Sequence, residues 1–206
     1  LYIFIALASM IIIAINIMPM HDNSFLTSLR YSSFQVSTIM TTTGYATTDF
    51  ALWPTLSKVI LITLMVIGAS AGSTGGGIKV SRLLILFKAA KKEISMIIHP
   101  RRVQTVKVDG HVLEDRVLVN VLVFLCLYAA IAFVSIILIS IDGYDFETTA
   151  TAVLAALGNI GPGFSMVGPL GNFSKLILSF CMLAGRLEIF PMLILFSPKI
   201  WSKKAL

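Results

Sequence analysis

The residues that could do chemistry lie in a hydroxyl-rich stretch, residues 38–47, which contains Thr42-Thr43-Gly44-Tyr45. Segments apolar enough to be membrane helices flank it. Polar, non-helical backbone at membrane depth is tolerated only where it is buried in protein or lines a water-filled cavity. Backbone carbonyl groups around threonine and glycine can replace the hydration shell of a potassium ion. The stretch therefore predicts an ion-conducting pore loop, with a filter formed by Thr42, Thr43, Gly44 and Tyr45.

A second copy of the same plan lies downstream, because Gly161 follows Gly44 by 161 − 44 = 117 residues. The same offset aligns several further residues: Val36 with Val153, Ser57-Lys58 with Ser174-Lys175, Met65 with Met182, and Gly68 with Gly185. Internal repeats are common in transport proteins and define their architecture. We therefore expect a second filter at Asn159, Ile160, Gly161 and Pro162, where the missing amide donor of proline is harmless.

Composition indicates an integral membrane protein. Only 13% of the 206 residues are charged, against about 25% in soluble domains, and the mean hydropathy is +0.92. The net charge of +6 could suggest nucleic acid binding, but the basic residues lie between or after apolar spans, which favours the positive-inside pattern. Cys126 and Cys181 fall inside apolar segments, so we expect buried thiols rather than a disulfide. Because Leu1 already lies in a hydrophobic run, we expect the chain to belong to a longer polypeptide.

The first half of the chain reads as a span, a re-entrant half-helix and a broken span. Residues 1–20 carry no charge and can cross a hydrocarbon core of about 30 Å. Residues 24–40 are too polar for a span, and their helical part of roughly 13 residues would cover about 20 Å. The C-terminal end of this half-helix would direct its negative dipole end at the filter and favour a cation.

The second half repeats this plan after a basic connection. Eight Lys and Arg residues against one Glu place residues 79–107 in the cytoplasm. The expected elements are then a span, a half-helix and a last span: residues 117–141, 146–157 and 172–196. Asp145 is expected to cap the half-helix, although acidic residues at an outer mouth also concentrate cations. The predicted division is a first repeat, 1–92, a cytoplasmic linker, 93–115, and a second repeat, 116–206.

A glycine-rich break interrupts the span at residues 59–78. Its five glycines cannot hold a regular helix in lipid unless neighbouring protein satisfies the backbone: Gly68, Gly72, Gly75, Gly76 and Gly77. Broken helices of this kind mark ion or substrate pathways. A phosphate-binding loop fails on spacing, because Ile78 stands where that motif needs lysine. Close helix packing through small residues remains the structural alternative.

Arg186 is the other costly feature, because it interrupts the last span. A charged side chain near the middle of a span costs about 2.5–3.5 kcal/mol and normally faces an interior or a water-filled path. Glu188 is only two residues away and therefore lies on a different helix face. A role of Arg186 in the ion pathway is the prediction, and packing against backbone carbonyl groups is the alternative.

These motifs resemble the TrkH/KtrB family of potassium transporters, within the wider group that includes the plant HKT proteins. The resemblance covers nearly the whole chain. It is carried by four segments: Thr42-Thr43-Gly44-Tyr45, residues 68–77, residues 158–163 and Ala184-Gly185-Arg186-Leu187-Glu188-Ile189-Phe190. It implies four span–pore-loop–span repeats around one pore. This chain is similar to the third and fourth.

The resemblance also implies roles for individual residues and partners. The break, matching Ala69–Gly77, would be an intramembrane gate, and Arg186 would lie close to it. Family members form homodimers that bind cytosolic, nucleotide-binding regulatory subunits. The implied fold class is an all-α membrane protein, with two repeats of a four-repeat, potassium-channel-like pore.

The resulting functional prediction is potassium uptake across a bacterial inner membrane by a multi-pass protein in contact with membrane lipid. Potassium, the substrate, would be coordinated by the carbonyl groups of Thr42, Thr43, Asn159 and Ile160, and no cofactor is expected. The alternative is a cation-coupled secondary transporter that carries potassium or sodium, for which only Glu188 supplies a midplane carboxylate. We expect neither an enzyme, because no nucleophile–base set is present, nor binding of nucleic acid.

Overall fold

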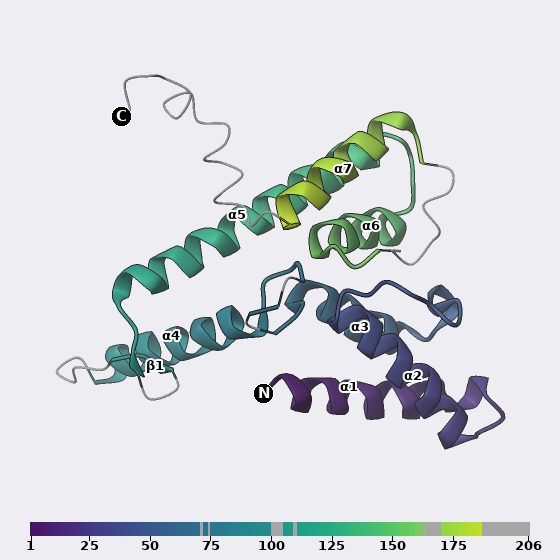
Figure 1. Ribbon diagram of the computed structural model, residues 1–206, viewed down its shortest axis with the longest axis horizontal. Helices are drawn as coiled ribbons and strands as arrows, with labels where there is room; N and C mark the ends of the chain where they lie inside the picture. Colours follow the sequence, from purple (N-terminus) through teal and green to yellow (C-terminus); the bar gives the residue numbers. More distant parts are fainter. Residues whose placement is uncertain are drawn as a thin grey trace.

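The chain is a helical protein with one small hairpin (Figure 1). The computed structural model describes residues 1–70, 72–73, 75–99, 105–108, 111–161, 163 and 170–186. The helices are α1 (Tyr2–Ile17), α2 (Phe25–Met40), α3 (Thr55–Ile67), α4 (Val80–Ile98), α5 (Asp115–Ser140), α6 (Phe146–Gly158) and α7 (Asn172–Arg186). Two short 3₁₀ turns are η1 (Met18–Met20) and η2 (Phe50–Leu52). The antiparallel strands β1 (Lys107–Val108) and β2 (His111–Val112) join α4 to α5.

The helices form two units of three, α1–α3 and α5–α7, which lie side by side in Figure 1. In each unit the middle helix, α2 or α6, packs against both of the other two helices. Helices α3 and α7 begin at Thr55 and Asn172, which differ by 172 − 55 = 117 residues. The spacing found in the sequence therefore holds for the starts of α3 and α7.

Each unit has its own hydrophobic core, and the two cores interlock. The first core lies among α1, α2 and α3 and includes Ile13, Ile17, Ile39, Leu61 and Met65. The second lies among α5, α6 and α7 and includes Phe124, Ile139, Val153, Leu157 and Cys181. Ile160, which follows α6, is buried in the first core, while Ile78, which follows α3, is buried in the second. This exchange holds the two units together close to the predicted filter.

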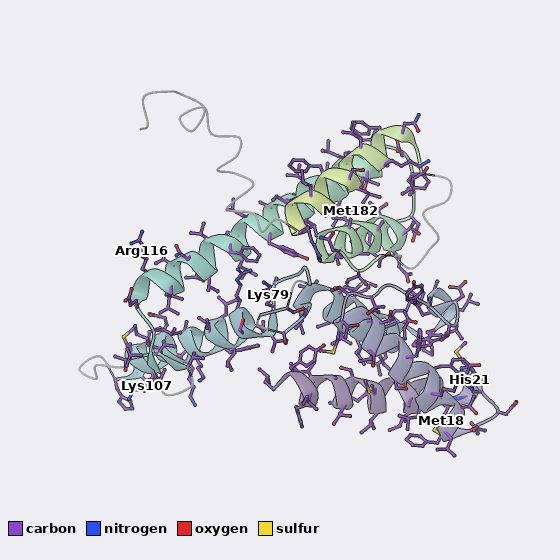
Figure 2. All side chains as sticks on the ribbon, viewed as in Figure 1. Met18, His21, Lys79, Lys107, Arg116 and Met182 are labelled. Atoms are coloured by element: carbon purple, nitrogen blue, oxygen red, sulfur yellow. The ribbon has the colours of Figure 1, made fainter. Side chains whose placement is uncertain are left out.

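In the described part of the chain, two helices are long and apolar enough to cross a membrane: residues Tyr2–Met20 and Arg116–Ser140. Figure 2 shows Met18 and His21 at one end of the molecule, and Lys107 and Arg116 at the opposite end. The predicted half-helix 24–40 is confirmed, but α2 has 16 helical residues, more than the 13 expected, because helix persists from the Ser24 cap to the filter. The predicted last span 172–196 is described only to Arg186.

The two cysteines differ in their surroundings. Cys181 is a buried free thiol, as predicted, and its sulfur donates to the Ser135 hydroxyl at 3.1 Å. Cys126 is also free, but the prediction that it is buried is wrong, since it lies on the exposed side of α5. An apolar helix that packs on one side only leaves its remaining apolar residues facing outward.

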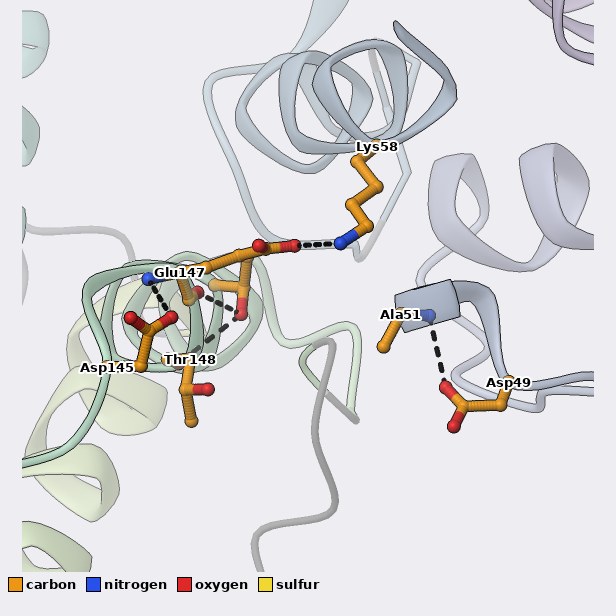
Figure 3. A network of polar contacts seen from close by, with 7 residues as sticks. Asp49, Ala51, Lys58, Asp145, Glu147 and Thr148 are labelled. Carbon is orange, nitrogen blue, oxygen red and sulfur yellow. Dashed lines mark hydrogen bonds and ion pairs between the residues drawn. The ribbon is translucent and has the colours of Figure 1, made fainter. Parts of the chain in front are cut away.

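The N-terminal cap of α6 leads to a first prediction. The Asp145 carboxylate accepts a hydrogen bond from the Glu147 amide at 3.1 Å, so the predicted capping role is confirmed (Figure 3). Asp145→Ala should destabilise the protein by about 1 kcal/mol, or roughly 2–4 °C in melting temperature. Asp145→Asn keeps the acceptor and should melt close to the wild type. Equal melting of all three proteins would contradict the cap.

Candidate functional site

The two predicted filter loops have the same unusual backbone. Thr42 and Asn159, which are related by the repeat offset, both have left-handed φ angles, 56° and 51°. Two residues further on, Gly44 and Gly161 again have positive φ angles, 84° and 122°. Such angles are uncommon for residues other than glycine, so a shared pattern at four positions does not arise by chance packing. The two loops are copies of one structure.

Hydrogen bonds at the helix ends repeat with the same offset. The Thr43 amide donates to the Thr38 carbonyl at 2.9 Å, and the Ile160 amide donates to the Ala155 carbonyl at 2.9 Å. These bonds direct the amide groups of the loops back toward α2 and α6. Within the described part of the chain, no backbone amide donates to the carbonyl groups of residues 42–44 or 159–161. These carbonyl oxygens thus accept no hydrogen bond from a described backbone amide.

The two loops meet at their glycines. A Cβ atom added to Gly44 would collide with the carbonyl oxygen of Ile160, and one added to Gly161 would lie 3.3 Å from the Gly44 Cα atom. Only glycine therefore permits this approach. The structure brings together the predicted residues Thr42, Thr43, Gly44, Ile160 and Gly161. Tyr45 is 73% exposed, and Pro162 lies outside the described residues.

The glycine-rich break lies between α3 and α4 and folds back on itself. The Ile78 amide donates to the Val66 carbonyl at 3.2 Å, and the Val80 amide donates to the Ala69 carbonyl at 3.1 Å. These bonds close the break into a loop whose two ends, at Gly68 and Gly77, are in contact. The hydrogen bonds thereby hold the loop next to the C-terminal end of α3, where a regular helix would have continued the span.

This loop contacts the first filter and the end of α6. A Cβ atom added to Gly75 would lie 3.1 Å from the Thr42 hydroxyl oxygen, and one added to Gly76 would collide with the Gly158 carbonyl oxygen. The first contact reaches the filter of the first unit, and the second reaches the end of α6. Among the predicted gate residues, Gly75 therefore lies directly against the predicted first filter. Gly72 differs from them, because no atom lies within 4 Å of its added Cβ.

Helix α7 closes the site on the side of the second filter. The Asn159 side-chain amide donates to the Met182 carbonyl at 3.0 Å, and Gly185 packs against the Leu157 carbonyl. A cavity of about 240 Å³ lies between α7 and the glycine loop, lined by Ser73, Gly75, Gly77, Lys79, Phe124, Gly185 and Arg186. Arg186 thus faces the same cavity as the loop. Glu188 lies outside the described residues.

Two basic side chains line this cavity, and the sequence predicted only one of them there. Besides Arg186 it contains Lys79, the residue before α4, whose φ angle of 68° is left-handed. The interpretation of Lys79 as part of a cytoplasmic basic connection did not place it beside the gate. The sequence feature that could have placed Lys79 there is its position just after the glycine-rich break. The structure therefore places Lys79 and Arg186, from the two units, in one cavity.

Polar contacts that the sequence did not predict join the helices around the filters. The Ser57 hydroxyl donates to the Asn16 side chain at 2.7 Å, and the equivalent Ser174 donates to the Asp142 carboxylate. Between the units, the Lys58 ammonium lies 2.8 Å from the Glu147 carboxylate (Figure 3). The matched pairs Ser57/Ser174 and Lys58/Lys175 could have indicated these contacts in the sequence, because polar residues repeated at equivalent positions of two spans suggest equivalent contacts.

Carbonyl and hydroxyl oxygens are the ligands that this site offers to a cation. Among the described residues there is no group of three or more His, Cys, Asp or Glu side chains that could hold a metal ion. The arrangement consists instead of two half-helices whose C-terminal ends point at two glycine loops that lie in contact, with a glycine-rich segment against them. Such an arrangement defines the transmembrane class of proteins with re-entrant pore loops.

Comparison with known proteins places the chain within this class. Residues 3–204 match the model of the TrkH family, described as cation transport protein, and the chain belongs to this family. The Trk system potassium uptake protein TrkH of Salmonella typhimurium is 37% identical over 199 residues, which cover 94% of this chain and 41% of that protein. Its counterpart in Vibrio parahaemolyticus is 42% identical over 172 residues, which cover 82% of this chain and 36% of that protein.

A solved structure supports the same assignment. The crystal structure of the potassium transporter TrkH from Vibrio parahaemolyticus superposes with a TM-score of 0.87 at 37% identity. The superposition covers 98% of this chain and 44% of that chain. The family resemblance and the predicted fold class, a helical membrane protein with pore-loop repeats, are confirmed. The chain spans less than half the length of the relatives that it matches.

Proposed function

We propose that this chain forms half of a potassium uptake pathway across a bacterial inner membrane. The observation that carries the proposal is the meeting of two equivalent loops, where Gly44 lies against the Ile160 carbonyl group. Carbonyl groups at Thr42, Thr43, Asn159 and Ile160 would take the place of water around a dehydrated potassium ion. The TrkH relatives are named for potassium uptake, which supports the choice of ion.

The proposed gate is the loop from Gly68 to Gly77. It touches the first filter at Thr42 and the end of α6, and it lines the cavity that contains Lys79 and Arg186, so its closed form would obstruct an ion that leaves the filter. Glycine makes rearrangement of such a loop inexpensive, because many backbone conformations are open to it. The loop is thus suited to move aside without disturbing α3 or α4.

The proposal extends to partners and location. The name "Trk system" indicates more than one component, and we propose cytosolic nucleotide-binding subunits as regulators of a homodimer. The predicted repeats 1–92 and 116–206 and the linker 93–115 would place the hairpin and the end of α4 on the cytoplasmic side, with lipid around the outer helices. The second candidate is a cation-coupled secondary transporter, for which Glu188 would be the coupling carboxylate.

The test is potassium uptake by the whole transporter that contains this chain, reconstituted in proteoliposomes. We expect uptake of potassium driven by its own gradient, with sodium excluded. A matched set of vesicles with an opposing proton or sodium gradient separates the two candidates. Uptake that requires such a gradient and is lost in Glu188→Gln would favour the coupled transporter, and absence of potassium uptake would contradict both.

A further inference from the structure

Helix α4 follows the glycine loop directly and has little apolar packing of its own. Among its residues, all of which the structure describes, only Val80 is buried. The Val80 amide donates to the Ala69 carbonyl at 3.1 Å, so the first turn of α4 is hydrogen-bonded to the loop. Displacement of this turn therefore moves the loop. Because α4 buries so little apolar surface, contacts of its long basic side chains carry a larger share of what fixes it in place.

Two such contacts join α4 to α5 and to the hairpin that leads to α5 (Figure 1). In the first turn of α4, the central guanidinium carbon of Arg82 lies over the Phe124 ring, 4.0 Å from its centroid. Further along α4, the Lys88 ammonium donates to the Lys107 carbonyl of β1 at 2.8 Å. One contact thus lies next to the glycine loop, and the other lies toward the opposite end of α4.

Phe124 connects the first of these contacts to the cavity beside the glycine loop. Its side chain is 4% exposed and belongs to the second core, which also contains Ile78 at the end of the loop. The same residue lines the cavity of about 240 Å³, together with Gly75 and Arg186. The face of an aromatic ring attracts a cation electrostatically, and most strongly where water is excluded. Phe124 therefore contributes a specific attraction for Arg82 in addition to apolar area.

We propose that Phe124 is a positioning residue for the gate, because its ring holds Arg82, and with it the first turn of α4 and the glycine loop, in the closed arrangement. The inference rests on the proposed function for the role of the loop as a gate. The contact joins the two units, since the loop and α4 follow α3, whereas Phe124 belongs to α5. Opening of the loop then requires Arg82 to leave the ring. The strength of the hold depends on the charge of the guanidinium group and on the electron density of the ring face.

The first test replaces Phe124 with a trifluorinated phenylalanine in the whole transporter. Fluorine withdraws electron density from the ring face and leaves the shape of the ring almost unchanged. In proteoliposomes without a regulatory subunit, the substitution should raise potassium flux about fivefold, because the attraction for the cation is lost. The same amino acid at Phe133, which is 66% exposed on α5, is the matched control and should leave flux unchanged.

A double-substitution cycle assigns the effect to Arg82. Arg82→Gln should raise flux by itself, and fluorination of Phe124 in that background should have no further effect. Arg82→Lys keeps a cation and should raise flux less than Arg82→Gln. In a transporter that takes up potassium, a flux that fluorination of Phe124 leaves unchanged would overturn the proposal. An equal effect of fluorination with and without Arg82→Gln would also overturn it, because the ring would then act through another group.

Hydrogen exchange gives a second measurement that does not depend on transport. The amides of Ile78 and Val80 close the loop through their bonds to the Val66 and Ala69 carbonyl groups, and their exchange reports its opening. Fluorination of Phe124 should speed exchange at both amides about fivefold. The Gly68 amide, which donates to the end of α3, should be unaffected.

These exchange rates separate failure of the inference from failure of the proposed function. Unchanged exchange at Ile78 and Val80 would refute the positioning role of Phe124, even if potassium uptake is intact. Faster exchange at both amides, in a transporter whose wild type takes up no potassium, would refute the proposed function and support the hold of Phe124 on the loop.

Discussion

Replacing Gly44 with alanine should reduce the preference for potassium over sodium by about tenfold or more in the whole transporter. The added Cβ would collide with the Ile160 carbonyl oxygen, which is one of the proposed ligands. The φ angle of 84° adds strain for any residue with a side chain. A displaced carbonyl group changes the relative binding of the two ions, and about 1.4 kcal/mol corresponds to tenfold. Ion-selective uptake in proteoliposomes measures the effect.

Gly143 offers a matched control for this substitution. Its φ angle of 80° gives alanine a similar backbone strain, but no atom lies within 4 Å of the added Cβ. Gly143→Ala should therefore lower stability without changing selectivity. If Gly44→Ala keeps the wild-type preference for potassium in folded protein, or if both variants lose it equally, the assignment of Gly44 to a filter is wrong.

Replacing Arg186 with alanine should raise potassium flux and weaken its dependence on a regulatory subunit. Arg186 faces the cavity that the glycine loop lines, and its guanidinium group can donate up to five hydrogen bonds. Loss of one charged hydrogen bond costs a closed loop about 1.5 kcal/mol, or about a tenfold shift toward the open form. Removal of the charge also lowers the barrier to a cation. Flux per reconstituted protein is the measurement.

Two further variants separate these contributions. Arg186→Lys keeps the positive charge but loses the planar arrangement of donors, so its flux should lie between those of the wild type and Arg186→Ala. Gly72→Ala adds no contact with the described residues, but its φ angle of 79° strains any side chain, so its flux measures the effect of backbone strain in the loop without loss of the charge. Lower flux in folded Arg186→Ala would mean that the residue is structural or assists permeation, and the gate hypothesis would then fail.

Local chemistry made much of this molecule predictable. Uncharged runs of sufficient length indicated the spans, and Asp145 marked where the second half-helix begins. The offset of 161 − 44 = 117 residues between Gly44 and Gly161 predicted the two equivalent units. These features depend on hydropathy, helix capping and backbone preference, which act over a few neighbouring residues. They can therefore be predicted from the amino-acid sequence alone.

The tertiary structure alone decided which surfaces of these elements meet. The sequence placed Gly44 in a predicted pore loop and Gly76 in the glycine-rich break. It did not show that Gly44 lies against Ile160 or that Gly76 lies against the end of α6. Likewise Lys58 pairs with Glu147, whereas Lys175, its equivalent in the repeat, is exposed. The physical reason is that periodicity defines a helix face but not its neighbour. The neighbour depends on packing between residues that are far apart in the sequence. Here Ile160 from the second unit is buried in the first core, and Ile78 from the first unit is buried in the second core.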